Sequence, residues 1–312
     1  MMTSDTAPET AGAQRRVVIG GASGLIGDAL ARSLSADGVD VTRLVRGAPR
    51  SSNEIEWRPG EAPLDPAVIA GAQAVVCLNG ASIGRLPWTR SYRETLRDSR
   101  IAPTRTIAAA VRELGADAPA LLNASAVGYY GDRPGERLSE YSGPGSTFLA
   151  ELCVAWEQAA LEAGADARIV LLRTAPLIDR GGVLKPLLLL TRLGLSGPLG
   201  GGSQRWPWIS LADEVRAIRH LIDSDVAGPV NLAGPAPASA NDTGLAIART
   251  LRRPFLVPAP AWALRLALGR DAADALLLSD AEVAPEALLG SGFRFAHRTV
   301  EEAVDAALAT DR

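Results

Sequence analysis

The stretch VVIGGASGLIG, from Val17 to Gly27, decides the fold of this chain. Its apolar start, Val17 to Ile19, is typical of a strand that is covered on both faces. Gly21, Gly24 and Gly27 follow at three-residue spacing, and apolar residues at helical spacing come next, namely Ile26, Ala29, Leu30 and Leu34. The stretch therefore predicts a buried strand, a glycine turn and a helix.

This succession is the pattern of a dinucleotide-binding turn. Gly21 can take the tight turn, Gly24 lets the backbone approach a pyrophosphate, and Gly27 lets the helix pack close to the strand. The phosphates would meet the free amides and the positive end of the helix. A turn without any ligand could use the same glycines, but a second strand, Val39 to Val45, follows the helix as the fingerprint requires. We therefore expect a cofactor to contact the turn residues Gly21, Ser23, Gly24, Leu25, Ile26 and Gly27.

Composition and charge narrow the class of protein. The 312 residues suffice for about two domains, or for one large α/β domain with a cap. The formal net charge of −3 shows no basic excess, so we expect neither nucleic acid nor a membrane as a partner. Cys77 and Cys153 lie far apart in apolar surroundings and are expected to be small buried side chains, not a disulfide or a metal pair. Two unpaired cysteines are typical of a reducing compartment, so we expect a cytoplasmic protein.

The sequence predicts neither a signal peptide nor a membrane-spanning segment. Residues 1–14 are small and polar, lack the apolar core of a signal peptide, and are predicted to form a disordered tail. The longest apolar stretch, Val183 to Leu195, contains Lys185, Pro186 and Arg192 and is too short to span a bilayer.

Strand and helix patterns alternate over residues 15–233. The predicted strands are Ala74 to Leu78, Ala120 to Ala124, Arg168 to Arg173 and Pro229 to Leu232, and the predicted helices are Ser91 to Leu114, interrupted near Pro103, Thr147 to Ala163, and Asp213 to Ser224. This rhythm predicts an α/β domain with a Rossmann-type, doubly wound parallel sheet. Residues 234–312 begin with the proline-rich GPAPAS and continue as short helices broken by prolines. We expect a small, mostly helical C-terminal cap that closes over the cofactor and supplies substrate contacts.

Several motifs resemble one family. They are GGASGLIG, LNGASIG, DSRIAPTRT, SAVGYYG, the Trp156-Glu157 pair, GGVL, GGGSQRWPWI, SDAEVAP and GFRF. Together they resemble the epimerase-like branch of the extended short-chain dehydrogenases/reductases, also labelled the NAD-dependent epimerase/dehydratase family, with its C-terminal domain of unknown function. The resemblance covers Arg16 to about Ala307. It implies a nicotinamide cofactor that supplies or accepts hydride, and a small-molecule substrate such as a sugar or a carbonyl compound.

The end of the second strand favours one cofactor over the other. Arg43 and Arg46 stand where an NAD-specific enzyme would place a carboxylate for the ribose hydroxyls. Two cations suit a 2′-phosphate, so we expect NADP(H), with NAD(H) as the alternative, although two solvated surface arginines would look the same. The resemblance further implies that Leu78, Asn79, Gly80 and Ala81 pass beneath the adenine and ribose, with Asn79 where alanine is more usual. Arg100, within DSRIAPTRT, completes the expected cofactor site.

The expected catalytic group departs from the family pattern. The resemblance implies that Ser125 hydrogen-bonds a substrate oxygen and that a tyrosine with a lysine four residues later exchanges the proton. Phe148 and Leu152 hold those two positions, so Tyr129 or Tyr130, which follow Ser125, become the candidates for proton exchange. Plain packing of the two tyrosines, and a turn cap by Ser125, are the alternatives.

The loop GGGSQRWPW is the expected substrate site. Gln204 matches the nucleotide-sugar enzymes of the superfamily, but Trp206 replaces their diphosphate-binding arginine, and Arg205 is displaced by one position. A nucleotide-diphosphate sugar is therefore a doubtful substrate. Trp206 and Trp208 are expected to line an apolar pocket, although edge packing would also suit tryptophans beside a proline.

Histidines and other carboxylates add no further chemistry. His220 and His297 have no partner at ligand spacing, so we expect structural roles and no metal. Glu140 and Glu157 lie at a helix start and on a helix face, where an interaction with the helix dipole or a salt bridge explains a carboxylate without catalysis. The sequence thus predicts an NADP(H)-binding oxidoreductase or epimerase-like enzyme. The alternative is a non-catalytic NADP(H)-sensing regulator, such as a cell-division inhibitor; the oligomeric state is left open.

Overall fold

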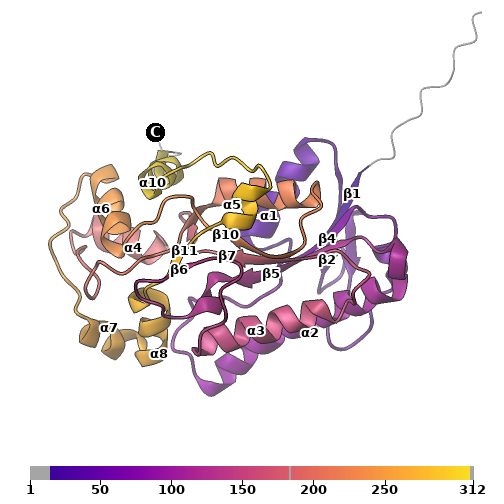
Figure 1. Cartoon of the computed structure of the whole chain (residues 1–312), viewed down its shortest axis with the longest axis horizontal. Helices are drawn as coiled ribbons and strands as arrows, with labels where there is room; N and C mark the ends of the chain where they lie inside the picture. The colour runs from indigo at the N-terminus through magenta and orange to yellow at the C-terminus, as the bar shows by residue number, and fades with distance from the viewer. Residues whose placement is uncertain (1–14, 183, 310–312) are drawn as a thin grey trace, which may run out of the picture.

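The computed structural model describes residues 15–182 and 184–309 (Figure 1). The predicted N-terminal tail lies outside these residues. At the centre is a seven-stranded, all-parallel sheet in the order β10-β7-β5-β4-β1-β2-β3. Its strands are β1 (Arg16–Gly20), β2 (Asp40–Val45), β3 (Glu54–Glu56), β4 (Ala74–Cys77), β5 (Ala120–Ala126), β7 (Ile169–Thr174) and β10 (Gly228–Leu232). The predicted Rossmann-type doubly wound sheet is thereby confirmed.

Two layers of helices cover the sheet (Figure 1). Helices α1 (Leu25–Ala36) and α5 (Leu211–Ile222) pack on one face, and α2 (Arg90–Leu114) and α3 (Phe148–Leu161) pack on the other. The apolar stripe of each helix fills the core beside the sheet, as Leu30 of α1 and Ile107 of α2 illustrate, both fully buried. Each such side chain contributes about 1.5–3 kcal/mol through burial. The inner strands β1, β4 and β7, covered on both faces, accordingly contain runs of three or four apolar residues.

Helix α2 differs from the prediction at Pro103. The interruption expected there is wrong: α2 is one helix of 25 residues with Pro103 inside it. A proline removes one backbone hydrogen bond from a helix interior. Here Ile101, Thr104 and Ile107 are all buried on the same side, and their packing outweighs the lost bond. The edge strand β3 was not predicted, because three residues that alternate Glu-Ile-Glu carry too little pattern.

The remaining elements lie outside the central sheet and the four helices that cover it. They are the short pairs β6 (Arg137–Leu138) with β11 (Glu282–Val283) and β8 (Leu177–Ile178) with β9 (Ile209–Ser210), the 3₁₀ turns η1 (Pro66–Val68), η2 (Gly115–Asp117) and η3 (Val127–Tyr130), the π-helical turn η4 (Asp274–Leu278), and the helices α4 (Leu184–Arg192), α6 (Ala240–Thr250), α7 (Ala261–Leu268), α8 (Arg270–Ala273), α9 (Glu286–Gly290) and α10 (Val300–Ala309). The C-terminal region is mostly helical, as predicted.

The C-terminal segment packs back onto the sheet domain. Leu288 and Phe293 join the core on the α1–α5 side of the sheet. The buried Asp213 carboxylate, at the start of α5, accepts hydrogen bonds from the backbone amides of Ala296 (2.7 Å) and His297 (2.9 Å). Among residues 15–182 and 184–309, no helix combines the length and apolarity needed to cross a membrane.

Candidate functional site

The glycine turn between β1 and α1 is built for close backbone contact. Gly21 has a φ of +82°, and a Cβ there would lie 2.7 Å from the carbonyl of Leu78. A Cβ on Gly27 would lie 2.4 Å from the Gly21 oxygen, so both glycines are needed for the turn itself. Gly24 is different: its Cβ would meet only the Gly21 oxygen, at 3.3 Å, and the residue is exposed. Gly24 therefore has open space in front of it.

The start of α1 offers free hydrogen-bond donors beside that space. Gly24 is the N-cap residue of α1 and brings no side chain to satisfy the amides of the first turn. Ser23 and Leu25 are exposed, whereas Ile26 is half-buried and packs against the core. The loop after β8 approaches the same helix end, since a Cβ on Gly181 would lie 3.8 Å from Leu25. An exposed helix N-terminus of this kind is suited to a phosphate.

Parallel pairing of β1, β2 and β4 brings the other expected cofactor residues to the carboxyl edge of the sheet, beside the glycine turn. Gly20, at the end of β1, lies level with Leu44 of β2 and with Cys77 of β4. The loop after β4 therefore begins beside the glycine turn, and the Leu78 amide donates to the Gly20 oxygen at 2.9 Å. A Cβ on Gly20 would lie 2.6 Å from Oδ1 of Asn79, so Gly20 makes room for that side chain. The sequence analysis missed this role of Gly20.

Arg43 presents an unsatisfied donor at the same edge. It lies in β2, level with Ile19, and is half-buried. Its Nε is buried and has no hydrogen-bond partner within the described part of the chain. A buried donor without a partner destabilises the folded protein by about 1–3 kcal/mol, and by more when it is charged. An anionic ligand group that accepts a hydrogen bond from Nε would remove this penalty. Arg46, the residue directly after β2, is exposed.

Arg100 supports the loop of Leu78, Asn79, Gly80 and Ala81 from within the protein. Its guanidinium donates to the carbonyls of Ala81 and Leu96, both at 3.0 Å, and lies 5.1 Å from the ring centre of Trp156. A Cβ on Gly80 would approach the Arg100 guanidinium to 3.1 Å. Burial lowers the pKa of this guanidinium. These contacts show Arg100 holding the loop.

A buried polar network lies beneath the end of β5. Ser125 donates to Oε1 of Glu157 at 2.7 Å. Arg173, on the neighbouring strand β7, donates to both carboxylate oxygens of Glu157, at 2.8 and 2.9 Å. All three residues are buried. Burial by itself would lower the pKa of Arg173, but the hydrogen bonds and charge of Glu157 outweigh it and raise that pKa.

The two candidate tyrosines have different surroundings. Tyr130 is fully buried; its hydroxyl donates to Asn231 at 2.7 Å and accepts from Arg173 at 3.0 Å. Burial raises the pKa of Tyr130. Tyr129 is half-buried, its ring lies 3.6 Å from the Arg173 guanidinium, and its hydroxyl has no hydrogen-bond partner among the residues described. The hydroxyls of Ser125 and Tyr130 are thus engaged inside the protein, whereas that of Tyr129 is available.

Phe148 and Leu152 form part of an apolar cluster. Phe148, the first residue of α3, lies 5.8 Å from Trp88 between ring centres, and Arg93 lies 4.8 Å from its ring. Leu152, one turn later, is buried against Trp88 and Leu96. No proton-transferring group stands at either position.

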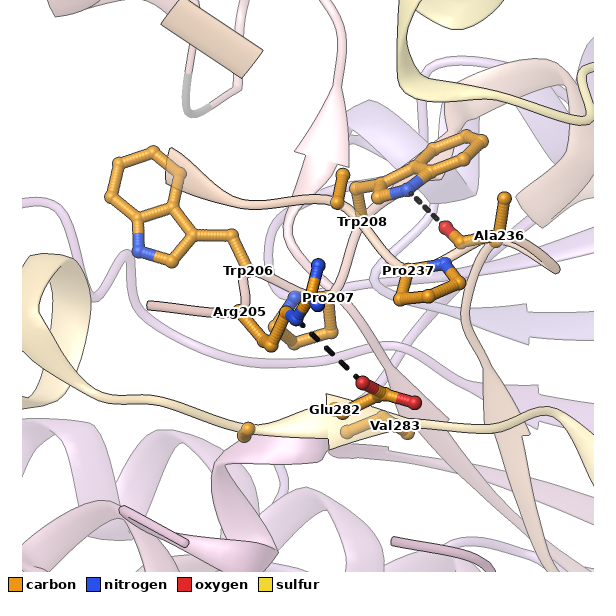
Figure 2. A pocket seen from close by; sticks show the side chains of 11 residues that line it. Arg205, Trp206, Pro207, Trp208, Ala236, Pro237, Glu282 and Val283 are labelled. Atoms are coloured by element: carbon orange, nitrogen blue, oxygen red, sulfur yellow. Dashed lines mark hydrogen bonds and ion pairs between the residues drawn. The ribbon is translucent and has the colours of Figure 1, made fainter. Parts of the chain in front are cut away.

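The loop around Trp206 lines a pocket, as Figure 2 shows. Arg205 and Glu282 face each other across it, 3.7 Å apart. Trp206 donates to the carbonyl of Leu277 at 3.1 Å, and the buried Trp208 donates to that of Ala236 at 3.0 Å. Gln204 is also buried, and its amide donates to two backbone carbonyls, those of Leu199 and Leu277. The polar atoms of Gln204, Trp206 and Trp208 thus bind the protein's own backbone, and their contact with a substrate stays a prediction.

The remaining polar residues join elements together. Glu140 accepts from the backbone amides of Asn231 (3.0 Å) and Ala287 (3.1 Å), the latter in the first turn of α9. His220 hydrogen-bonds Ser291, and His297 hydrogen-bonds Ser210. The described residues contain no group of three His, Cys, Asp or Glu side chains able to hold a metal.

Glu214 is a buried carboxyl that the sequence analysis missed. It is fully buried in the first turn of α5; Oε1 accepts from the Thr174 hydroxyl at 2.8 Å, and Oε2 has no partner in the described structure. Burial raises the pKa of Glu214 from 4.5 to about 8. The folded protein therefore holds a proton here that the unfolded chain releases above about pH 4.5.

This carboxyl predicts a pH-dependent stability. Because the folded-state pKa lies above the unfolded one, the free energy of unfolding should fall as pH rises between about 4.5 and about 8. The slope approaches about 1.4 kcal/mol per pH unit. Urea unfolding from about pH 5 to about pH 9 should show this fall in the parent protein and a flatter profile in Glu214→Gln. The exposed Glu301→Gln is the control; parallel profiles for all three proteins would contradict the assignment.

Comparison with known proteins agrees with this geometry. The model of the NAD dependent epimerase/dehydratase family matches residues 17–233, and that of a domain of unknown function, DUF1731, matches residues 259–307. The epimerase family protein Mb2239 of Mycobacterium bovis is 42% identical over 291 residues, covering 92% of this chain and 96% of the relative. The epimerase family protein SDR39U1 of Bos taurus is 31% identical, with 90% and 95% coverage.

Solved structures show the same relationship. The crystal structure of human epimerase family protein SDR39U1 with NADPH has a TM-score of 0.85 at 27% identity and covers 94% of this chain and 99% of that one. MoeE5 in complex with UDP-glucuronic acid and NAD, at 20% identity and a TM-score of 0.73 over 93% and 96% of the two chains, shares the fold. The glycine turn, the sheet order and the matched family model lead to one conclusion: the chain belongs to the NAD-dependent epimerase/dehydratase family.

Proposed function

We propose that this protein is an NADP(H)-dependent oxidoreductase acting on a small carbonyl or sugar substrate. The observation that carries the proposal is the buried, unpartnered Nε of Arg43 at the cofactor edge of the sheet. A 2′-phosphate would supply the missing acceptor through a charge-assisted hydrogen bond. The NADPH in the structure of the human relative supports this assignment.

The residues at the carboxyl edge of the sheet fit such a cofactor. The open side of Gly24 and the free amides of α1 would hold the pyrophosphate, and the loop of Leu78 to Ala81, supported by Arg100, would lie under the adenosine part. When bound, the cofactor supplies or accepts hydride. The protein orients it and polarises the substrate.

Tyr129 is the proposed proton donor. It follows β5, whose carboxyl end lies at the cofactor edge, and its hydroxyl is uncommitted. Arg173 on the ring face and Tyr130 at the ring edge fix its orientation. Ser125 is buried and donates its proton to Glu157, so it has no part in the proposed proton transfer.

Cofactor preference tests the role of Arg43. NADPH should bind more tightly than NADH, and Arg43→Ala should remove most of the difference, because a charge-assisted phosphate contact contributes about 1.5–3 kcal/mol. Calorimetric titration of both cofactors measures it, with the exposed Arg32→Ala as a control on α1. Equal affinities in the parent protein would refute the assignment.

Gly24→Val tests the phosphate turn. The added side chain meets only one backbone atom of the protein, so the variant should fold, yet it fills the space proposed for the pyrophosphate. We expect NADPH binding to become undetectable while the melting temperature changes little. Gly143→Ala, at an exposed position with open space and no positive φ, is a substitution control for glycine loss elsewhere. Full NADPH affinity in folded Gly24→Val would place the cofactor elsewhere.

Binding without turnover is the second candidate function. Phe148 and Leu152 fill the family's tyrosine and lysine positions with packed apolar side chains, which favours a protein that binds the cofactor as a signal. A screen of carbonyl and sugar compounds, read out as NADPH oxidation, separates the candidates. Consumption of NADPH with any substrate supports the enzyme; tight binding with no consumption supports the sensor.

A further inference from the structure

Helix α7 is apolar but uncovered. Its sequence, AWALRLAL, has a single charged residue, and none of its eight residues is buried. Trp262 is 69% exposed and Leu266, one turn later on the same side, is 82% exposed. A helix that is apolar around most of its circumference is normally buried. Something outside the described chain is therefore expected to cover it.

The uncovered surface extends beyond α7. The amides of Leu256 and Val257 donate to the Ser196 carbonyl, at 2.9 and 3.0 Å, so the segment leading into α7 runs beside the segment that leaves α4. Figure 1 shows α4, α6 and α7 at one end of the molecule and β1 and β2 at the other. We call this surface the apolar band; its exposed side chains are Leu189, Leu190, Leu193, Leu195, Leu256, Val257, Trp262 and Leu266. Patches of such extent mark interaction sites.

The segments that carry the apolar band are also cationic. Residues 184–200 and 249–270 contain no Asp or Glu, and their seven cations are Lys185, Arg192, Arg249, Arg252, Arg253, Arg265 and Arg270. Within the described structure, the ion pairs of this set join Arg265 and Arg270 to Asp274. A chain with a formal net charge of −3 thus concentrates positive charge around its most exposed apolar residues. The expectation from the net charge that no membrane is bound averages over the whole chain, whereas the cations are concentrated in these two segments.

We propose that the apolar band docks on an anionic lipid surface. Tryptophan and leucine side chains on a short helix enter the boundary between headgroups and acyl chains, and arginines beside them contact anionic headgroups. Trp262 and Leu266 on α7 provide the apolar side chains, and the exposed Arg252 and Arg253, which precede the helix, provide the cations. The arginine and lysine stems also let the charged groups reach the headgroups while their methylenes stay near the acyl chains.

A second copy of the chain fits this surface less well. A two-fold contact sets the same patch against itself. The cations of residues 184–200 and 249–270 would then face one another, and Asp274, the carboxylate that pairs with this set in the described structure, is already engaged by Arg265 and Arg270. An anionic surface meets both the apolar and the charged parts of the band.

Vesicle sedimentation of the full chain tests the proposal. We expect binding to phosphatidylcholine vesicles that contain about one third phosphatidylglycerol, little binding to phosphatidylcholine alone, and weakening at high salt. Trp262→Ser/Leu266→Ser and Arg252→Glu/Arg253→Glu should each reduce binding about tenfold or more. Leu289→Ser, on exposed α9 outside the apolar band, should bind like the parent protein.

Two further measurements make the outcome decisive. Circular dichroism and NADPH affinity should be unchanged in all the variants, which separates this proposal from that for the cofactor site. Light scattering after size exclusion reports the oligomeric state. Absence of vesicle binding overturns the proposal, and a dimer that Trp262→Ser/Leu266→Ser dissociates would assign the apolar band to a second copy instead. Equal binding by the parent protein and both double variants also overturns it.

Discussion

Replacing Arg173 by methionine is expected to lower the free energy of unfolding by about 3–5 kcal/mol, the range found when one partner of a buried ion pair is removed. Arg173 is 3% exposed and Glu157 is 5% exposed. The substitution leaves the Glu157 carboxylate in the protein interior with the Ser125 hydroxyl as its remaining hydrogen-bond donor. It also removes the donor to the Tyr130 hydroxyl. Urea unfolding followed by circular dichroism measures the loss.

Two control variants separate the buried charge from general effects of losing an arginine. Arg105→Met breaks an exposed ion pair with Glu162 and should cost about 1 kcal/mol or less. Arg173→Met/Glu157→Leu removes both buried charges and should recover a large part of the stability. If Arg173→Met were no more damaging than Arg105→Met, the Glu157–Arg173 pair would not be the structural centre of the site.

The fold and the glycine turn could be predicted because their signals are local. VVIGGASGLIG contains the strand, the turn and the helix start in one stretch, and each later strand is a short apolar run between helical patterns. Parallel strands then bring their carboxyl ends to one edge, which places Gly24, Arg43 and Asn79 near one another without further information. The interruption of α2 predicted at Pro103 is wrong because the effect of this proline depends on the packing of α2 against α3.

The surroundings of Ser125, Tyr129 and Tyr130 could not be predicted to the same degree, because their contacts join distant parts of the chain. Tyr130 donates a hydrogen bond to Asn231, 101 residues later, and Ser125 donates one to Glu157, 32 residues later. A charged residue in the apolar strand IVLLRT signals that Arg173 needs a partner, but not which carboxylate provides it. Glu214 carried no such signal, since its helix has an ordinary amphipathic pattern and only the structure shows that this position faces the core.

The same contacts decide which tyrosine should matter for chemistry. Tyr130→Phe removes a hydroxyl that is held between Asn231 and Arg173, so its main effect should be on stability, a loss of about 1–3 kcal/mol for the partners left unsatisfied. Turnover should change little once the variant is folded. Tyr130→Phe is thus a matched control, one residue away from the proposed proton donor.

Tyr129→Phe should lower turnover by about 10²-fold or more and leave NADPH affinity and stability nearly unchanged. The Tyr129 hydroxyl makes no hydrogen bond within residues 15–182 and 184–309, so its removal leaves no buried group unpaired, and the ring keeps its contact with Arg173. A loss of rate would therefore come from proton transfer. Steady-state rates of both variants, on a substrate found by the NADPH oxidation screen, provide the measurement. If Tyr129→Phe keeps the parent rate, the proton passes through water or the substrate, and the half-buried tyrosine beside β5 serves only to pack against Arg173.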